Sequence, residues 1–585
     1  MSTNIIGISA HYHDSACCLI QDGVLKAAVQ EERFTRKKND PDLPKKAFMY
    51  CLKEGGIGMA DIDCIAYYED SRKKLSRQLW SGIQGLTSQQ IMDIQPLRVE
   101  ESIRKDLGFN GLIKVYEHHQ SHAASSFFYS DFKESAILTV DGVGEWATTS
   151  YGTGKDAALE IFEEVEFPNS IGLLYSTLTS FLGFSVNSGE YKVMGLAPYG
   201  RPVFADKIWQ MIRLTEKGQY ELDMQYYNFL KGARMYSDLL AQLLGIPPRR
   251  KDTDILAVHK DIAKSLQVVL EEILISKAQY LHDVTGSENL CMAGGVALNC
   301  VANGKILKHT SFKNMFVQPA AGDAGCSLGA AALAYADITG KRIAKTENHV
   351  YLGPSYSNDS IRKVLQSTSL VFSDFESRED ELLQHIAQKI ADGKVIGWFH
   401  GRMEFGPRSL GARSILADPR GAQMRDRINA MVKKREAFRP FAPAILSEET
   451  SKHFDLDHDS PFMLETCDVI SHLDLPAITH VDRSARVQTV HKETNPRFYK
   501  LLQAFQKITG CPILLNTSFN IKDEPIICSP EEAVVCFVTT DIDCLVVEDF
   551  FIDAEGNDLS LLEMINQNLV RAVEFELNPD VYTFI

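Results

Sequence analysis

The sequence contains no apolar run approaching the ~18 residues that suggest a membrane-spanning helix. Its longest apolar stretch, residues 325–336, is rich in Gly and Ala and is interrupted by Ser327. The first ten residues, MSTNIIGISA, lack the cationic start and apolar centre of a secretory signal. Together these absences predict a cytoplasmic protein without a membrane partner.

Paired cysteines and an excess of basic residues are also missing. The 12 cysteines are scattered and form no CxxC pair, so we expect neither a zinc-binding nor a disulfide framework. Lys and Arg number 61 against 77 Asp and Glu, which gives a formal net charge of −16. Because a broad nucleic-acid surface needs clustered cations, we expect no nucleic-acid partner.

A chain of 585 residues is too long for one hydrophobic core, which predicts at least two domains. A polar stretch at residues 340–360 contains Gly353-Pro354 and suggests a boundary near residue 350. We therefore predict domains at 1–350 and 351–585. The last thirty residues, which include Gly556-Asn557, are expected to form a peripheral tail.

The pattern of apolar runs and turns predicts an α/β protein. Asp22-Gly23 separates the apolar runs 15–20 and 24–30, a strong signal for a β-hairpin. Further expected strands cover residues 135–140, 289–292, 395–399 and 512–515. Expected helices cover residues 255–281, 323–338, 382–392 and 530–539. Several of these strands run into glycine turns with polar tips, where the backbone can approach phosphate closely.

One group of residues has the composition of a metal site. His118 and His122 are four residues apart, so they share one face of a helix. Asp141 follows an expected strand, and Asp323 opens a Gly/Ala-rich helix. Two imidazoles and two carboxylates suit a divalent iron, manganese or zinc ion. His119 replaces His118 in this set if the helix begins later.

A second group of residues predicts an anion site. The segment GWFHGRMEFGPRSLGARSILADPR includes the end of an expected strand and a glycine loop that carries Arg402, Arg408 and Arg413. The guanidinium groups of these three arginines suit polyphosphate recognition. Further polar residues follow in INAMVKKREAFRPFAPA, VDRSARVQTV and PILLNTSFN. In an acidic protein, cations gathered on glycine turns and strand ends point to an anionic ligand.

Taken together, eleven motifs resemble the NodU/TobZ-type O-carbamoyltransferases, which decorate antibiotics, nodulation factors and related metabolites. They lie in family order between residue 5 and about residue 550. The motifs are GISAHYHDSA, QEERFTRKK, HHQSHAAS, VDGVGEW, EYKVMGLAPYG, GGVALN, AGDAG, FGPRSLGARSI, KREAFRPFAP, SARVQTV and LLNTSFN.

The resemblance implies a two-step enzyme. A C-terminal YrdC-like domain would form carbamoyl-adenylate from ATP and carbamoyl phosphate with release of pyrophosphate, with Mg²⁺ accompanying ATP. An N-terminal domain of the duplicated actin/Hsp70/sugar-kinase type would then pass the carbamoyl group to an acceptor hydroxyl. The acceptor would be a small secondary metabolite or a sugar, and the oligomeric state stays open, with a homodimer among the options.

The resemblance assigns roles to individual residues, and the residues themselves add Arg413 from the glycine loop and His13 with Asp14 as a candidate base. Matched to the family's Fe²⁺ ligands are His118, His122, Asp141 and Asp323. Expected to bind nucleotide or carbamoyl phosphate in the second domain are Arg408, Arg413, Lys433, Arg486, Asn516 and Ser518. Expected around the adenylate in the first domain are Glu190, Lys192, Gly294, Gly295 and Asn299. Expected to take part in catalysis are His13, Asp14, Arg408 and Lys433.

Two of these expectations carry alternatives. His13, next to Asp14, is a candidate base for the acceptor hydroxyl, because an imidazole with a near-neutral pKa can take that proton; orienting the nucleotide is an equal alternative. Arg483 stands where the family motif leads us to expect Gly, and it either contacts phosphate or faces solvent.

Other functions remain as alternatives. A sugar kinase or ATPase chaperone would explain the glycine turns but leaves the histidine pair and the second half of the chain unused. Modification of tRNA of the threonylcarbamoyl type shares the chemistry, but the acidic balance and the lack of a basic arm weaken it. Hydrogenase-maturation carbamoylation would require zinc-finger segments, and the sequence has no CxxC pairs.

Overall fold

The computed structural model describes residues 2–81, 98–230, 234–344, 349–433, 438–557 and 559. Their contacts divide these residues into two compact units. The first contains residues 2–31 and 39–344, and the second contains residues 32–38 and those from 349 onward. The segment Glu32–Lys38, which includes helix α1 (Glu32–Thr35), therefore packs in the second unit. Apart from residues 557 and 559, the tail expected after Gly556 lies outside the described residues.

The first unit begins with a five-stranded sheet in the order β3-β2-β1-β4-β5. Its strands are β1 (Asn4–Ser9), β2 (Ala16–Gln21), β3 (Val24–Gln30), β4 (Cys64–Tyr67) and β5 (Leu112–Val115). Strands β1, β2 and β3 pair antiparallel, whereas β4 and β5 join β1 in parallel. Asp22 and Gly23 both have positive φ, the conformation that a two-residue hairpin requires, so the predicted hairpin is confirmed.

The second sheet repeats this arrangement, with the order β12-β11-β6-β7-β8. Its strands are β6 (Glu134–Val140), β7 (Ala147–Lys155), β8 (Ala158–Glu166), β11 (Asn289–Ala293) and β12 (Asn314–Val317). Strands β6, β7 and β8 are antiparallel, and β11 and β12 continue from β6 in parallel. Two sheets with one topology confirm the duplicated α/β fold that the resemblance to the actin/Hsp70/sugar-kinase type implied.

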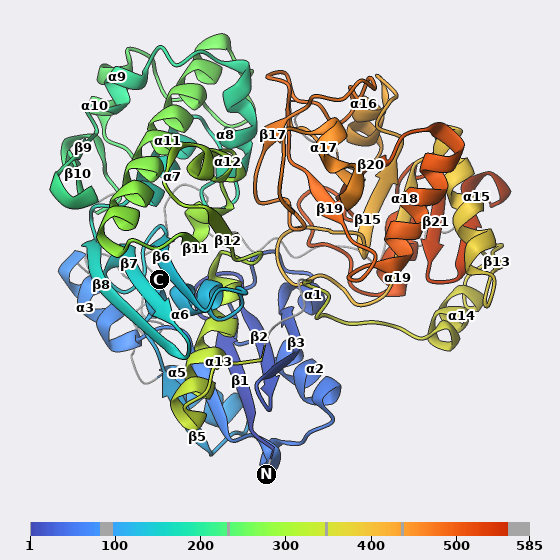
Figure 1. Ribbon diagram of the computed structural model, residues 1–585, viewed down its shortest axis with the longest axis horizontal. Coiled ribbons are helices and arrows are strands. Elements are labelled where there is room, and N and C mark those ends of the chain that lie inside the picture. Colours follow the sequence, from blue (N-terminus) through green and yellow to red (C-terminus); the bar gives the residue numbers. More distant parts are fainter. Residues whose placement is uncertain are drawn as a thin grey trace. The chain divides into compact units, whose positions relative to one another are not determined.

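Helices of the first unit surround these sheets (Figure 1). They are α2 (Lys45–Gly55), α3 (Ser71–Ser81), α5 (Arg98–Asp106), α6 (His118–Phe127), α7 (Ile171–Phe181), α8 (Glu190–Leu196), α9 (Ala205–Ile208), α10 (Asp238–Leu244), α11 (Ala257–Thr285), α12 (Cys300–His309) and α13 (Asp323–Thr339). A small hairpin of β9 (Ile212–Leu214) and β10 (Tyr220–Leu222) lies between α9 and α10 in the sequence. No helix among the described residues has the length and apolar character needed to cross a membrane.

Helices α6 and α13 approach each other closely because of one glycine. A Cβ on Gly329 of α13 would lie 1.8 Å from the carbonyl oxygen of Ser121 on α6, so no larger residue fits there. The two helices carry three of the four predicted metal ligands, His118, His122 and Asp323. Their close packing therefore sets how near His118 and His122 come to Asp323.

The second unit contains an eight-stranded mixed sheet in the order β13-β22-β21-β14-β15-β20-β16-β19. Its strands are β13 (Ser373–Asp374), β14 (Ile396–Phe399), β15 (Arg413–Ala417), β16 (Ala442–Leu446), β19 (Gln488–Val490), β20 (Ile513–Ser518), β21 (Cys544–Val547) and β22 (Phe550–Asp553), and β17 (Cys467–Asp468) pairs separately with β18 (Ser484–Ala485). The helices are α14 (Asn358–Gln366), α15 (Glu379–Ala391), α16 (Met424–Ile428), α17 (Thr450–His453), α18 (Pro496–Thr509) and α19 (Pro530–Val538).

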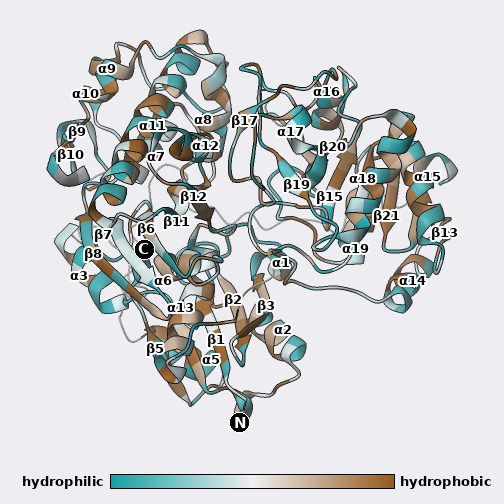
Figure 2. Ribbon diagram, in the orientation of Figure 1, coloured by the Kyte–Doolittle hydropathy of each residue, from teal (hydrophilic) through white to brown (hydrophobic). Residues whose placement is uncertain are grey.

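The apolar side chains of the second sheet form one core with its helices. Trp398, Phe498 and Phe505 are fully buried in it, and Figure 2 shows β21 as largely hydrophobic. The expected elements at residues 382–392, 395–399, 512–515 and 530–539 correspond to α15, β14, β20 and α19 within three residues at each end. A second α/β domain is thus confirmed.

Candidate metal centre and nucleotide site

The first site forms where parallel strands of the second sheet end. Asp141 directly follows β6, and Gly294-Gly295 follows β11, its parallel neighbour. Because the carboxyl ends of parallel strands meet at one edge of a sheet, these turns come together. The backbone N–H of Gly295 donates to Oδ1 of Asp141 at 2.9 Å. A Cβ on Gly294 would lie 2.2 Å from the carbonyl oxygen of Val140, so the turn requires glycine.

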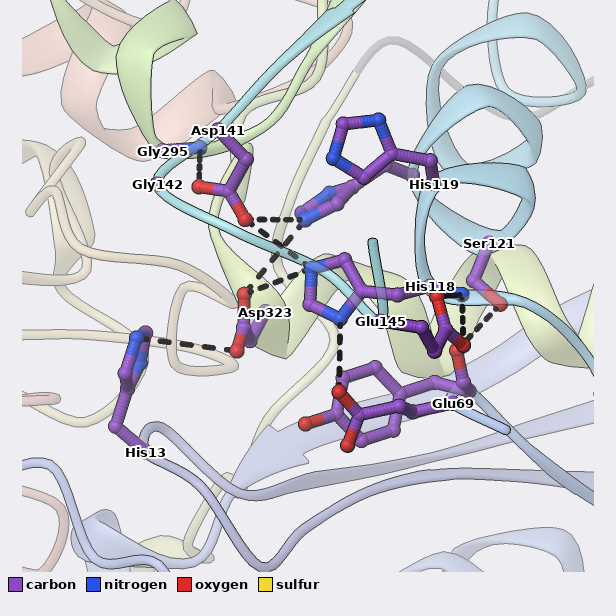
Figure 3. A network of polar contacts seen from close by, with 12 residues as sticks. His13, Glu69, His118, His119, Ser121, Asp141, Gly142, Glu145, Gly295 and Asp323 are labelled. Carbon is purple, nitrogen blue, oxygen red and sulfur yellow. Dashed lines mark hydrogen bonds and ion pairs between the residues drawn. The ribbon is translucent and has the colours of Figure 1, made fainter. Parts of the chain in front are cut away.

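Figure 3 shows His118, Asp141 and Asp323 converging at this edge, and His122 joins them there. His118 Nε2 lies 3.1 Å from Asp141 Oδ2 and 3.6 Å from Asp323 Oδ1. His122 Nε2 lies 3.4 Å and 3.6 Å from the same two oxygens. All four side chains are at least nine-tenths buried. The structure thus brings together the whole set that the sequence predicted.

The donor set fits one divalent cation. Bonds of about 2.1 Å place neighbouring ligand atoms about 3.0 Å apart at a right angle and about 3.4 Å apart in a tetrahedron. Two of the four separations, 3.1 and 3.4 Å, lie in this range, and the other two, both 3.6 Å, exceed it by about 0.2 Å. His122 Nε2 and Asp323 Oδ2 are buried but make no well-aligned hydrogen bond. Buried polar atoms of this kind are expected to face a ligand.

The charges of the cluster favour a cation as well. Burial raises the pKa of Asp141, but hydrogen bonds from His118 and His122 outweigh this effect and hold the pKa well below its usual value. Burial also raises the pKa of Asp323, but the charges of His13 and His118 outweigh this effect and lower the pKa below its usual value. Both carboxylates are therefore ionised at neutral pH.

Two glutamates that the sequence did not single out surround His118. Glu145 accepts hydrogen bonds from the backbone N–H of His118 at 2.9 and 3.1 Å and from that of Asp70 at 2.7 Å. Glu69 Oε1 lies 3.8 Å from His118 Nδ1, and Lys74 pairs with Oε2 of Glu69 at 2.8 Å. Carboxylates beside a ligand imidazole fix its orientation. Glu145 lies in the VDGVGEW motif, whereas nothing in the local sequence marks Glu69.

His13 joins the cluster from the first sheet. Its Nε2 lies 3.8 Å from Asp323 Oδ2, and its Nδ1 lies 3.1 Å from Asp14 Oδ2. Burial lowers the pKa of His13, but the charge of Asp323 and the contacts with Asp14 together raise it to about 9. Without a cation in the site, this ring is therefore mostly protonated at pH 7.

His119 is directed elsewhere. Its Nδ1 lies 2.7 Å from the hydroxyl of Ser150, and it belongs to no group of potential ligands among the described residues. Burial lowers the pKa of His119 well below its usual value, and the neighbouring histidines add to this effect. Helix α6 begins at His118, so His118, rather than His119, shares a face with His122.

The other predicted residues of the first unit are held by local contacts. Glu190 accepts from the hydroxyl of Ser176 at 2.8 Å, and Lys192 lies over the ring of Phe184. Asn299 begins α12 by accepting from the backbone N–H of Ala302 at 3.0 Å. These contacts position the three side chains but do not identify a ligand.

Asn516 on β20 lies at the centre of the second predicted site. Its amide donates to the carbonyl oxygen of Ser409 at 3.2 Å and to Oε1 of Gln488 at 2.8 Å. The contacts therefore bring the loop with Arg408 next to β20 and β19. Asn516 Oδ1 and the Ser409 hydroxyl are buried without a partner, as expected for atoms that face a polar ligand. Sequence analysis did not identify Gln488.

Glu404 shapes this loop and was also missed. Its Oε1 accepts from the backbone N–H groups of Leu410 at 2.6 Å, Ala412 at 2.8 Å and Arg413 at 3.3 Å. Three donors on one carboxylate oxygen fix the path of the chain from residue 410 to residue 413. Glu404 lies in the predicted segment, but nothing in its spacing marked it as a scaffold.

Arg413 is fully buried and serves the fold. Its guanidinium donates to the carbonyl oxygens of Pro354, His400, Gly401 and Ala412. It also stacks over the ring of Phe399 at 3.5 Å. Its terminal nitrogens thus hold the surrounding backbone in place, while its Nε is buried without a partner, and its role in phosphate binding stays a prediction.

The remaining predicted residues of this unit differ in their surroundings. Arg486 is half-buried, and its Nε has no partner. The hydroxyl of Ser518 donates to Oδ1 of Asn520 at 2.6 Å. Arg483 is exposed and has a φ of 65°, a conformation that favours glycine. The Gly expected there thus has a backbone reason. The side chain of Lys433 lies outside the described residues.

A duplicated α/β unit with a buried His/Asp cluster and a second α/β unit define a two-unit enzyme with a candidate metal centre. Residues 4–332 match the family model for the carbamoyltransferase N-terminus, and residues 387–554 match that for the carbamoyltransferase C-terminus. The chain therefore belongs to the carbamoyltransferase family.

Relatives with known names cover nearly the whole chain. Nodulation protein NolNO of Sinorhizobium fredii is 41% identical over 556 residues, which cover 92% of this chain and 79% of that protein. The 3'-hydroxymethylcephem-O-carbamoyltransferase of Amycolatopsis lactamdurans is 28% identical and covers 93% and 98% of the two chains. Among solved structures, the ROK hexokinase from Thermus thermophilus covers 58% of this chain and 100% of its own at 14% identity, with a TM-score of 0.30. A score of this size supports no functional comparison.

Proposed function

We propose that this enzyme forms carbamoyl-adenylate from ATP and carbamoyl phosphate and transfers the carbamoyl group to a hydroxyl of a small molecule. The acceptor would be a secondary metabolite or a sugar. In the first step water would cleave carbamoyl phosphate to carbamate and orthophosphate. An oxygen of the carbamate would then attack the α-phosphate of ATP, and the β- and γ-phosphates would leave as pyrophosphate. A YrdC-like second unit would carry out this step with Mg²⁺-bound ATP, and the first unit would carry out the transfer.

The observation that carries this proposal is the buried His/Asp cluster beside the Gly294-Gly295 turn, in a member of the carbamoyltransferase family. A carbamoyl carbonyl is a poor electrophile because its nitrogen donates into it, and a mixed anhydride with AMP supplies a better leaving group. His118, His122, Asp141 and Asp323 would hold a divalent cation such as Fe²⁺. Such a cation would supply Lewis acidity towards the carbonyl oxygen.

The first unit would orient the acceptor and receive its proton. We assign the proton-accepting role to His13, because it lies at the edge of the cluster and Asp14 contacts its other ring nitrogen. A cation held by Asp323 would oppose the negative charge that raises the pKa of His13 and would thus favour the neutral ring that this role requires. The burial of the cluster would keep water from the activated carbamoyl group. A hydroxyl acceptor is supported by the name of the cephem O-carbamoyltransferase relative.

The second unit would bind the phosphates and the nucleotide. We assign this role to Arg408, Arg486, Asn516 and Ser518, together with Lys433. The buried atoms without partners around Asn516, namely its Oδ1 and the hydroxyl of Ser409, support a polar ligand there. Guanidinium groups suit phosphate oxygens because they donate two parallel hydrogen bonds.

The test is to incubate purified protein with ATP, carbamoyl phosphate, Mg²⁺ and Fe²⁺ and to measure pyrophosphate and carbamoyl-adenylate. We expect pyrophosphate release that depends on carbamoyl phosphate. Arg408→Ala should abolish it, while His118→Ala should retain it. Arg420→Ala is a matched control, because this arginine pairs with Asp418 at 2.7 Å and should leave the rate unchanged.

The outcomes separate the competing functions. Release of ADP in place of pyrophosphate would refute the adenylation step and favour the kinase or ATPase alternative. Pyrophosphate release that His118→Ala also abolishes would refute the assignment of the two steps to two units. Carbamoylation of tRNA by the complete reaction would replace the small-molecule acceptor.

A further inference from the structure

Cys326 lies next to the His/Asp cluster without belonging to the predicted ligand set. It follows Asp323 by three residues on α13, so both side chains point to the same face of this helix. That face packs on α6, which carries His118 and His122. Cys326 is fully buried. A thiol therefore stands one helical turn away from a metal-binding carboxylate.

The two histidines belong to two overlapping groups of potential ligands. One group adds Asp141 and Asp323 to the histidines, and the other adds the Sγ atom of Cys326. In each group all ligand atoms lie within 4.8 Å of one another. The five side chains do not form one group within that distance. His122 also has a buried Nδ1 and Nε2 without well-aligned hydrogen bonds.

The two groups differ in the cations that they prefer. Two imidazoles with two carboxylates suit harder ions such as Mn²⁺ and Fe²⁺, whereas a thiolate selects softer ions. Two ligands of one ion cannot be farther apart than the sum of their bond lengths, about 4.4 Å for a thiolate and a carboxylate oxygen. The thiol and the complete carboxylate set are therefore alternatives.

We propose that His118, His122 and Cys326 form a second, thiophilic binding mode of this centre, which takes a d¹⁰ cation of the Zn²⁺ or Cd²⁺ type. Binding replaces the thiol proton, which passes to the buffer, and the oxidation state of the metal does not change. Because the histidines are shared, a cation in this mode excludes a harder ion from the His/Asp mode. The inference uses the ligand geometry alone and does not depend on carbamoyl transfer.

The experiment is a titration of metal-free, full-length protein with Cd²⁺. Binding is monitored through the ultraviolet charge-transfer band from thiolate to cadmium. One equivalent should produce the band in the wild type and in Asp141→Asn. Cys326→Ser should lose the band and weaken Cd²⁺ binding by at least about tenfold, since even an indirect partner of a ligand contributes that much. Cys511→Ser, which changes a buried cysteine of the second unit, should retain the band.

Mn²⁺ binding, measured by electron paramagnetic resonance, should respond to the two substitutions in the opposite way. Asp141→Asn should weaken the affinity for Mn²⁺, and Cys326→Ser should leave this affinity within about twofold of the wild type. One equivalent of Cd²⁺ should displace bound Mn²⁺ from the wild type. A wild type without the charge-transfer band, or a band that persists in Cys326→Ser, would overturn the proposal. Simultaneous binding of one Cd²⁺ and one Mn²⁺ would do so too, because it would show that the histidines are not shared.

Discussion

Replacement of Lys277 by Met should stabilise the first unit at neutral pH. Lys277 lies on α11 and is fully buried. Its Nζ donates to the hydroxyl of Tyr151 at 2.9 Å and to the carbonyl oxygen of Gly218 at 2.6 Å, and it lies 4.2 Å from the centre of the Tyr220 ring. No carboxylate forms an ion pair with it among the described residues. Burial lowers the pKa of Lys277 from 10.5 to about 7.

This lowered pKa determines how stability depends on pH. Below pH 7 the lysine is charged in the folded and the unfolded protein, so folding bears the full cost of burying the charge. Above pH 10.5 it is neutral in both states, and the cost disappears. A fall in pKa from 10.5 to about 7 corresponds to roughly 5 kcal/mol, at about 1.4 kcal/mol for each tenfold change. Stability should therefore rise with pH between these values.

The free-energy cost of the buried charge can be compared with the hydrogen bonds that Met cannot form. At pH 7 the cost of the buried charge is about 4 kcal/mol, and at pH 9.5 it is about 1.4 kcal/mol. Met gives up two hydrogen bonds, each worth about 1 kcal/mol, while the hydroxyl of Tyr151 still donates to Gly218 at 2.7 Å. Lys277→Met should therefore gain about 2 kcal/mol at pH 7 and lose about 0.6 kcal/mol at pH 9.5.

Urea unfolding of both proteins at several pH values measures this difference. Lys264→Met, on the same helix but partly exposed, is the matched control and should show a difference that is independent of pH. A Lys277→Met protein that is less stable than the wild type at pH 7 would refute the reasoning. A difference that stays constant from pH 7 to pH 9.5 would refute it equally.

Three further substitutions test the backbone of the two sites. Gly294→Ala should destabilise the first unit by at least about 2 kcal/mol in urea unfolding, because its Cβ would lie 2.2 Å from Val140 O; wild-type stability would contradict this. Glu404→Ala should cost on the order of 3 kcal/mol by leaving three backbone donors unpaired, whereas Glu404→Gln keeps an acceptor oxygen and should cost less; equal losses would argue against the hydrogen bonds as the cause. Arg483→Gly should raise the melting temperature slightly, because glycine relieves about 1 kcal/mol of strain at positive φ. Part of this gain is lost because glycine also makes the unfolded chain more flexible. A large loss of stability would show that the arginine makes a needed contact.

Local spacing and the family resemblance together predicted which four side chains converge, because each of them sits next to a recognisable element boundary. Asp141 follows an apolar strand, Asp323 opens a Gly/Ala-rich helix, and the two histidines have a helical spacing of four. Parallel pairing of β6 and β11 then brings the strand ends together. The choice between His118 and His119 was left open, since it depends on where α6 begins.

Residues that act through distant partners could not be found in this way. Glu69 contacts His118 from another part of the chain, and no periodicity connects the two positions. Likewise, Glu32–Lys38 lies far from the second domain in the sequence, yet Arg36 donates to the carbonyl oxygens of Pro525 and Ile526. Such pairings are decided by tertiary packing, which a single sequence does not display.

Arg413 shows that hydrogen-bond partners in the structure indicate the role of an arginine better than the charge pattern of the sequence does. In the sequence it is one of three arginines in a glycine-rich segment, and this composition suggested phosphate binding. In the structure it lies on β15, where burial obliges its donors to find acceptors, and four carbonyl oxygens of the protein supply them. The Nε atoms of Arg413 and Arg486 are both buried without a partner, so Nε does not separate the two arginines. They differ in their terminal nitrogens, which have four carbonyl acceptors in Arg413 and no hydrogen-bond acceptor among the described residues in Arg486. On this criterion Arg486 is the stronger candidate for phosphate recognition.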